Sequence, residues 1–291
     1  MHGESTPSLH VYDDSESWWC YGACAAGGDA ASFIMQAEGC NFPKAVEIYR
    51  EITGDFDKYS LNRELEEDLM GLPFDSTVYE KIKERTGIDS KGYRGIRTDI
   101  SKMFGVRYEY NESNGDVVAT YYPCTVEYEL SGLKVRKHPK DFTSPYGETG
   151  KGAQLFGQFK FKTFTDTVMI VGGEHDMLAA FQMMYDYQKQ KQYNPIAVVS
   201  PTIGETAAYK QIQAQYEFFN QFKKIVVCMD NDDAGREAME KIVSVLPRGR
   251  VHIMNMRRKD PNAYIWDKEA QKPVNFQNEF VNDFWAAKPY T

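Results

Sequence analysis

The chain has 291 residues and a formal net charge of −8 at pH 7, with 42% hydrophobic and 26% charged residues. This length predicts two domains, or one large domain with a small appendage, in a globular protein of ordinary composition. No apolar run approaches the roughly eighteen residues of a membrane span, and the N-terminal residues do not resemble a secretory signal. The five unevenly spaced cysteines do not suggest a disulfide scaffold, which favours the cytoplasm. The negative charge argues against a globally basic nucleic-acid-binding surface, although basic residues cluster locally.

The first 54 residues are rich in cysteine, glycine, tryptophan and small residues, and form the first expected module. Apolar residues recur at helical spacing over 41–52, which predicts that this module ends in a helix. The following segment, 55–91, is charged and contains helical runs at 63–70 and 77–85. Its polarity predicts a helical linker rather than part of a core.

Short β-like runs dominate the next region, 92–163, and predict a separate subdomain. They lie at 106–110, 117–122 and 132–136. Basic residues gather in the same region and again near position 258. Taken alone, each basic cluster is better explained by a solvated surface than by a binding site.

An alternation of strands and helices is clearest over 164–262. Apolar runs lie at 167–171, 196–200, 225–229 and 251–256, and helical patterns lie at 176–190, 205–220 and 233–246. Strands that alternate with helices and are apolar on both faces predict a parallel sheet covered on both sides, so this segment is an α/β domain. The remaining residues, 263–291, are assigned to a C-terminal tail.

Acidic residues follow the predicted strands, where the chemistry of such a sheet is found. Asp230 and Asp232 come directly after the strand at 225–229 and point the same way if the chain is extended. Without nearby Cys or His, two such carboxylates suit a hard cation such as Mg²⁺. A helix cap would explain one aspartate here but not several.

A second acidic group, with Glu174 and Asp176, follows the first strand of this sheet, and Asp260 follows the last. Neighbouring parallel strands that end in carboxylates would share one metal site. Metals on acidic ligands are a common arrangement for displacement at phosphorus.

Three motifs in this order resemble the Toprim domain of primases and topoisomerases. They are Gly172-Gly173-Glu174-His175-Asp176, then Asp230-Asn231-Asp232-Asp233-Ala234-Gly235-Arg236, then Lys259-Asp260-Pro261-Asn262. Further motifs resemble the primase half of the primase–helicases of tailed phages. They are Gly92-Tyr93-Arg94-Gly95-Ile96, Leu133-Lys134-Val135-Arg136, Lys140-Asp141-Phe142, Leu155-Phe156-Gly157 and Leu246-Pro247-Arg248-Gly249-Arg250-Val251. Together they cover most of 92–262.

The resemblance implies a DNA primase that makes short RNA primers on a single-stranded DNA template from nucleoside triphosphates. It implies Mg²⁺ or Mn²⁺ at the Toprim site and a replicative helicase as partner, in the cytoplasm of a host cell if a phage encodes the protein. The implied catalytic residues are Glu174, Asp176, Asp230 and Asp232. The implied ligands of the metal are Glu174, Asp230, Asp232 and Asp260. The implied nucleotide- or DNA-binding residues are Lys134, Arg136, Lys140, Arg236 and Lys259.

The N-terminal module resembles the zinc ribbon of DnaG-type and phage primases, which implies Zn²⁺ and contact with the template. His2, Cys20 and Cys24 are the candidate ligands. Three residues rather than two separate the cysteines, and the family's first Cys would fall before Met1, so either the start of the chain is truncated or misassigned or the site is degenerate. The alternative is that these residues are small and buried, with no metal. Trp18, Trp19 and Tyr21 are expected in a core rather than on a surface that stacks with bases.

Gly172 is the main departure from the family, whose acidic turn begins with a metal-binding or acid–base Glu. Glu174 would replace that residue if the chain stays extended. Alternatively the protein is a catalytically impaired module that binds single-stranded DNA or a helicase. A Toprim nuclease is a second alternative, although the motifs outside Toprim favour a primase. No phosphate-binding sequence of a helicase motor is present, so the chain is a stand-alone primase or one half of a longer polypeptide.

Overall fold

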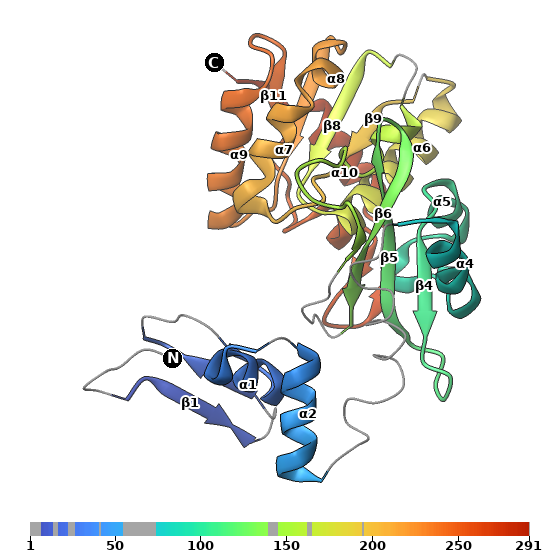
Figure 1. Ribbon diagram of the computed structural model, residues 1–291. Helices are drawn as coiled ribbons and strands as arrows, with labels where there is room; N and C mark the ends of the chain where they lie inside the picture. Colours follow the sequence, from blue (N-terminus) through green and yellow to red (C-terminus); the bar gives the residue numbers. More distant parts are fainter. Residues whose placement is uncertain are drawn as a thin grey trace. The chain divides into compact units, whose positions relative to one another are not determined.

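The structure is a computed structural model that describes residues 7–13, 17–22, 27–40, 42–54, 74–138, 145–161, 165–193 and 195–290. The chain divides into two compact units, Met1–Met70 and Gly71–Thr291 (Figure 1). This division falls inside the segment 55–91 that the sequence predicts as a linker. None of the helices among the described residues is long and apolar enough to cross a membrane.

The first unit contains a small antiparallel sheet. Its strands are β1 (Leu9–Tyr12), β2 (Ser17–Cys20) and β3 (Gly27–Gly28), in that spatial order. Side chains on one face of β2, such as Trp18, are buried, whereas β1 is exposed throughout. The sheet therefore packs on one face only.

Two helices complete this unit, α1 (Ala30–Glu38) and α2 (Phe42–Thr53). Asp29 begins α1 by accepting a hydrogen bond from the backbone N–H of Ser32, and the left-handed Gly39 ends it. The indole Nε1 of Trp18 donates to the carbonyl of Asp29 at 3.1 Å and so ties the sheet to the start of α1. The predicted helix over 41–52 is confirmed as α2, whereas α1 was not predicted.

The second unit begins with a helix that the sequence assigns to the linker. In α4 (Ser76–Arg85), Val78 and Ile82 are buried, and Arg85 donates to the hydroxyls of Tyr121 and Tyr146. The linker assignment is therefore wrong for this helix, because two apolar residues on its inner face are sufficient to bury an otherwise polar helix. The other predicted helix, at 63–70, lies outside the described residues.

An antiparallel sheet of four strands follows. It has the order β4 (Arg107–Tyr110), β5 (Val117–Val126), β6 (Glu129–Lys137) and β7 (Tyr146–Gly147). The short helix α5 (Thr98–Met103) precedes it. The three predicted β-runs are confirmed as β4 to β6, and β5 and β6 extend beyond the predicted limits.

The second sheet of this unit is mainly parallel and has the order β14-β11-β10-β8-β9. Its parallel strands are β8 (Thr167–Val171), β9 (Ala197–Val199), β10 (Lys224–Cys228) and β11 (Val251–Ile253). Its long helices are α6 (Glu174–Lys191), α7 (Glu205–Ala214), α9 (Asp233–Val245) and α10 (Gln277–Trp285). The predicted α/β class with a parallel sheet is confirmed. The single helix predicted over 205–220 is instead interrupted at Gln215, after which α8 (Tyr216–Asn220) begins.

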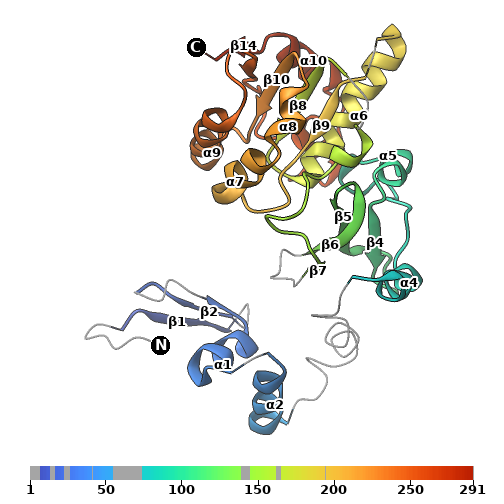
Figure 2. The same ribbon diagram turned by 45° about the horizontal axis from the view of Figure 1, so that its top comes forward.

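The connections of this sheet reverse direction between β8 and β10. From β8 the chain passes to β9 on one side, and then returns across β8 to β10 and β11 on the other. Because such crossovers are right-handed, α6 lies on one face of the sheet and α7 and α9 lie on the opposite face. Figure 2 shows α7 beside α9, and α6 packs with α10. The carboxyl ends of β8 and β10 therefore mark the point at which sheets of this kind bind ligands.

The segment 263–291, assigned to a tail, is instead part of the second unit. Its strand β14 (Lys288–Pro289) pairs antiparallel with β11, and Phe280 and Phe284 of α10 are buried. The assignment is wrong because the segment lacks the strand–helix alternation used to find the domain, while its apolar residues still face the core. Asp283 fixes it further by accepting from the Tyr264 hydroxyl at 2.6 Å and pairing with Arg257 at 2.9 Å.

We expect Asp283→Ala to lower the free energy of unfolding by about 1–3 kcal/mol, because the side chain is 5% exposed and its loss leaves the buried Tyr264 hydroxyl without its acceptor. Glu279→Ala on the same helix is the control, since its ion pair with Arg258 is more exposed and should contribute about 1 kcal/mol or less. Urea unfolding followed by circular dichroism measures both. Equal effects would show that the C-terminal segment does not depend on Asp283.

Candidate functional site

Acidic residues lie at the edge of the parallel sheet where β8 and β10 have their carboxyl ends, which we call the acidic crevice. Asp176 follows β8 and Asp230 follows β10, and these two strands are hydrogen-bonded neighbours. Asp260 follows β11 and caps the turn at Pro261–Tyr264 by accepting from the backbone N–H of Ala263 at 2.8 Å. The strand order thus places residues that are far apart in the sequence at one edge of the sheet.

Asp176 interacts electrostatically with both other carboxylates. Burial is the main cause that raises the pKa of Asp176, and repulsion from Asp260 and Asp230 adds to it, so that the pKa rises to about 7. The backbone N–H of Asn262 donates to its Oδ1 at 3.2 Å and partly offsets these effects. Concentrated negative charge of this kind favours a cation, which would relieve the repulsion.

Asp232 is the N-cap of α9. It accepts a hydrogen bond from the backbone N–H of Gly235 at 3.0 Å, which is the main cause that lowers its pKa, and it faces Lys259 Nζ at 3.6 Å. A Cβ on Gly235 would lie 2.0 Å from the carbonyl oxygen of Asp230. The glycine of this motif therefore allows the first turn of α9 to start directly against Asp230.

Glu174 lies in a different environment from Asp176. It is the first residue of α6, its side chain is 8% exposed, and its Oε1 lies 2.5 Å from Lys134 Nζ. Side chains two positions apart on a helix point about 200° apart, so Glu174 and Asp176 face different directions. The extended chain that the sequence analysis requires runs from Gly172 to Glu174, and Gly173 between them is extended, with φ −147° and ψ 163°.

The predicted metal ligands are Glu174, Asp230, Asp232 and Asp260. Among the residues that the structure describes, no three His, Cys, Asp or Glu side chains are grouped so that they could hold a metal ion. The aspartates fit Mg²⁺ in kind, because Mg²⁺ is commonly held by one or two carboxylates with water and substrate phosphates completing the octahedron. They do not form a closed protein cage, and whether these residues bind metal stays a prediction.

Basic residues line one face of β6 opposite the start of α6. Lys134 and Arg136 are two positions apart on the strand and so share a face, and His138 directly follows its end. Burial, followed by the charges of Arg136 and Arg94, lowers the pKa of His138 to about 4. The same kinds of effect, with burial the largest, hold the pKa of the buried His175 well below its usual range. The positive charge around these two histidines therefore comes from Arg136 and Arg94.

Arg94 was not predicted as a site residue, although its motif was recognised. Its backbone is left-handed, with φ 49° and ψ 35°, and its carbonyl accepts from Asn262 Nδ2 at 2.8 Å. Non-glycine residues held in this region often occur at functional sites. The two glycines that flank Arg94 in the sequence were the available signal.

The other predicted nucleotide-binding residues differ in how far they can be placed. Arg236 forms an ion pair with Asp233 on α9, and Lys259 faces Asp232. Both cations therefore lie beside the acidic motif that follows β10. Lys140 lies outside the described residues.

Of the three predicted zinc ligands, only Cys20 lies within the described residues. Its side chain is buried at the end of β2, and its Sγ lies 3.7 Å from the Ser8 hydroxyl. His2 and Cys24 lie outside the described part. A buried thiol at the end of a strand is chemically suited to zinc, so the residue present fits the ion.

The other face of this small sheet carries exposed aromatic rings. Trp19 is 42% and Tyr21 is 65% exposed, and His10 packs edge-on against Tyr21 with ring centroids 5.3 Å apart. The hydroxyls of Tyr12 and Tyr21 are hydrogen-bonded at 2.9 Å. The expected core position is confirmed for Trp18 and wrong for Trp19 and Tyr21, because neighbouring residues of a strand face opposite sides.

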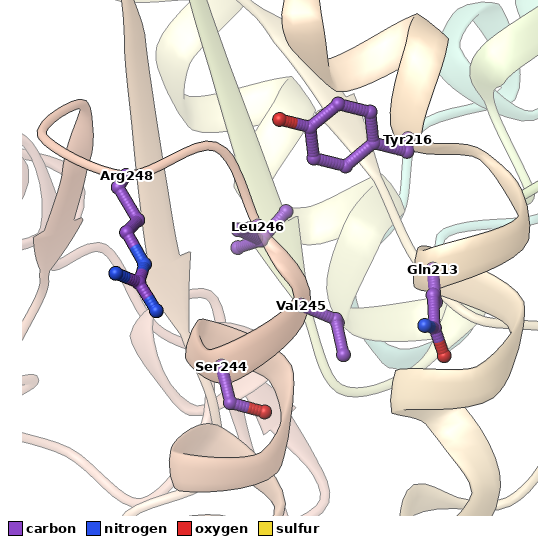
Figure 3. A pocket seen from close by; sticks show the side chains of 6 residues that line it. All are labelled: Gln213, Tyr216, Ser244, Val245, Leu246 and Arg248. Atoms are coloured by element: carbon purple, nitrogen blue, oxygen red, sulfur yellow. The ribbon is translucent and has the colours of Figure 1, made fainter.

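A pocket in the second unit lies between α7, α8 and the end of α9 (Figure 3). Its lining residues are Gln213, Tyr216, Ser244, Val245, Leu246 and Arg248. It contains none of the predicted site residues and no carboxylate, so it does not belong to the acidic crevice.

Two family models match the chain. Residues 1–61 match the CHC2 zinc finger, and residues 169–265 match the Toprim-like family. The predicted order, a zinc-ribbon module followed by a Toprim module, is confirmed. The first match implies a zinc ion.

Two curated relatives and one solved structure are similar to the chain. The DNA helicase/primase of Enterobacteria phage T3 is 30% identical over 195 residues, which are 66% of this chain and 30% of that protein. The DNA primase of Pseudomonas putida is 23% identical over 313 aligned positions, covering 86% of this chain and 44% of that protein. The crystal structure of the primase fragment of the bacteriophage T7 primase-helicase protein matches with a TM-score of 0.53 and 27% identity, over 66% of this chain and 72% of that one.

The chain thus combines a CHC2 zinc finger with a Toprim-like module. It is homologous to phage and bacterial DNA primases, and the resemblance stated from the sequence is confirmed. The chain spans about a third to less than half of the length of the two curated relatives described above.

We expect Cys20→Ser to release zinc from the protein, because a serine hydroxyl is a much weaker ligand than a thiolate. Cys40→Ser is the control, since Cys40 follows α1 outside the ligand pattern and should keep the metal content unchanged. The zinc content of purified protein is measured by inductively coupled plasma mass spectrometry. We expect roughly one zinc per chain in the wild type. Equal zinc in both variants would contradict it.

Proposed function

We propose that the protein is a DNA primase that synthesises short RNA primers on a single-stranded DNA template. The observation that carries this proposal is the position of Asp176 and Asp230 at the ends of the adjacent strands β8 and β10, within a Toprim-like match that is joined to a zinc finger. The homology to primases supports the same reaction. The substrates under this proposal are nucleoside triphosphates and a single-stranded template.

The roles of the residues follow from their charges. Asp230, Asp260 and Asp176 would hold Mg²⁺ or Mn²⁺, with Asp232 at its edge, and the ion would neutralise charge on the triphosphate. Lys134 and Arg136 would contact phosphate, as would Lys140, Arg236 and Lys259. These cations position the substrate without reading its sequence.

A replicative helicase is the proposed partner, because the related phage T3 protein is named a helicase/primase. We place the reaction in the cytoplasm, that of the host if a phage encodes the protein.

One observation favours a second candidate function. Gly172 occupies the position at which the family has Glu, and Glu174 is paired with Lys134 rather than grouped with the aspartates. The second candidate is therefore a primase-like module that binds single-stranded DNA or a helicase without making primers.

The test is synthesis of labelled primers from ribonucleoside triphosphates on random single-stranded DNA with Mg²⁺. We expect activity in the wild type and its loss by a factor of about 10² or more in Asp230→Ala, because the cation beside a polyphosphate loses a carboxylate ligand. Asp186→Asn is the control. Asp186 lies in the second half of α6 and forms an ion pair with Arg97. A wild type that is silent in both Mg²⁺ and Mn²⁺, and that gains activity on Gly172→Glu, would support the second candidate instead.

The exposed aromatic face of β1 and β2 supports template binding by the N-terminal module. Flat rings stack with unpaired bases of any sequence, whereas phosphate contacts give charge but no stacking. The exposed rings form a continuous surface, because each contacts at least one other ring across the face. They belong to His10, Tyr12, Trp19 and Tyr21.

We expect Trp19→Ala and Tyr21→Ala each to weaken binding of single-stranded DNA by about 1–3 kcal/mol, because each removes a ring on which a base stacks. Val11→Ala is the matched control, since Val11 is 69% exposed on the same sheet but lies on the opposite face. Fluorescence anisotropy of a labelled oligonucleotide measures the affinities. If Val11→Ala weakens binding as much as Trp19→Ala, the aromatic face is not the binding surface.

A further inference from the structure

One ion pair joins the antiparallel sheet to the start of α6 beside the acidic crevice. Lys134 Nζ of β6 lies 2.5 Å from Glu174 Oε1. The Glu174 side chain is 8% exposed and the Lys134 side chain is 32% exposed, so the glutamate is nearly enclosed while part of the lysine reaches solvent. A buried carboxylate requires a partner to compensate for lost hydration, and Lys134 provides it.

The surroundings of Glu174 belong to the basic face rather than to the aspartates. Tyr122 lies opposite Lys134 in the β5–β6 register, and the Glu174 charge helps to raise the pKa of this buried phenol, after burial itself. Asp176, by contrast, interacts with Asp230 and Asp260. The carboxylates of Glu174 and Asp176 therefore lie in two different environments.

We propose that Glu174 is a positioning residue that holds the Lys134 ammonium group where it contacts a phosphate of the incoming nucleoside triphosphate. Glu174 is on this view not the replacement for the metal-binding Glu that Gly172 lacks. An ammonium group has three donors, and a single bond to Glu174 leaves two for phosphate oxygens. The proposal rests on the primase function proposed above.

Two variants separate a positioning role from a metal-ligand role. If Glu174 acts through Lys134, then Glu174→Gln weakens nucleotide binding even without metal, and leaves the Mg²⁺ concentration for half-maximal synthesis unchanged. If Glu174 holds the metal, then Glu174→Gln raises the Mg²⁺ requirement and leaves metal-free binding unchanged. Asp230→Asn serves as the reference for a variant that raises the Mg²⁺ requirement.

The experiment is equilibrium dialysis of labelled ATP in EDTA, followed by Mg²⁺ titration of primer synthesis with the full chain. We expect Glu174→Gln to raise the dissociation constant of ATP roughly tenfold, as for loss of a charge-assisted contact, and KM to rise more than kcat falls. Glu237→Gln is the matched control, because it removes another Glu–Lys pair, with Lys241 on α9, that is exposed. Glu237→Gln should change neither the dissociation constant of ATP nor KM.

A double variant completes the test. Lys134→Gln together with Glu174→Gln should bind ATP no more weakly than Lys134→Gln alone, because Glu174 then has no lysine to position. It should also melt at a higher temperature than Lys134→Gln, which leaves a nearly buried carboxylate without its partner.

Several outcomes would overturn the proposal. Unchanged or tighter ATP binding by Glu174→Gln would show that Glu174 does not strengthen binding through Lys134. In the double variant, losses of ATP affinity that multiply would show that the two residues act independently. A wild type that binds ATP but makes no primers refutes the primase function alone, since the dialysis measurement still decides the role of Glu174.

Discussion

The parallel pairing of β8 with β10 is the constraint on which the candidate site depends. Each strand is buried and apolar and ends in a motif with a carboxylate, so their register sets the position of Asp176 relative to Asp230. The reversal of the connections at these two strands keeps the helices away from their carboxyl ends, because α6 leaves on one face and α9 on the other. The acidic crevice is thus a product of topology, and the local sequence only supplies the charges.

The strands of this sheet could be predicted because they are continuous apolar runs separated by amphipathic helices. The same method failed where burial depends on a few residues. In α4, Val78 and Ile82 alone face the core, and in 263–291 the buried Phe280 and Phe284 lie outside any strand–helix alternation. So few buried apolar residues give a sequence pattern that is too weak to distinguish a core helix from a solvated one.

The candidate site shows a corresponding division. The positions of Asp176, Asp230 and Asp260 after their strands follow from the motifs, whereas the direction of a side chain depends on where a helix starts. Because α6 begins at Glu174, the side chains of Glu174 and Asp176 diverge. The aromatic face was missed for a related reason: Trp18 and Trp19 are adjacent in the sequence, but a strand places one in the core and the other in solvent.

The divergence at the start of α6 also bears on Gly172. Lys134 lies 2.5 Å from Glu174 Oε1, so a metal ion on Glu174 would have to share this carboxylate with the lysine. The aspartates that remain repel one another, and this repulsion adds to burial, the larger cause, in raising the pKa of Asp176 to about 7. A site of this composition can still recruit a divalent cation when a polyphosphate completes the coordination, because the substrate then supplies the oxygen ligands that the protein lacks. The charge on the substrate, rather than a further protein carboxylate, would then decide whether the metal binds.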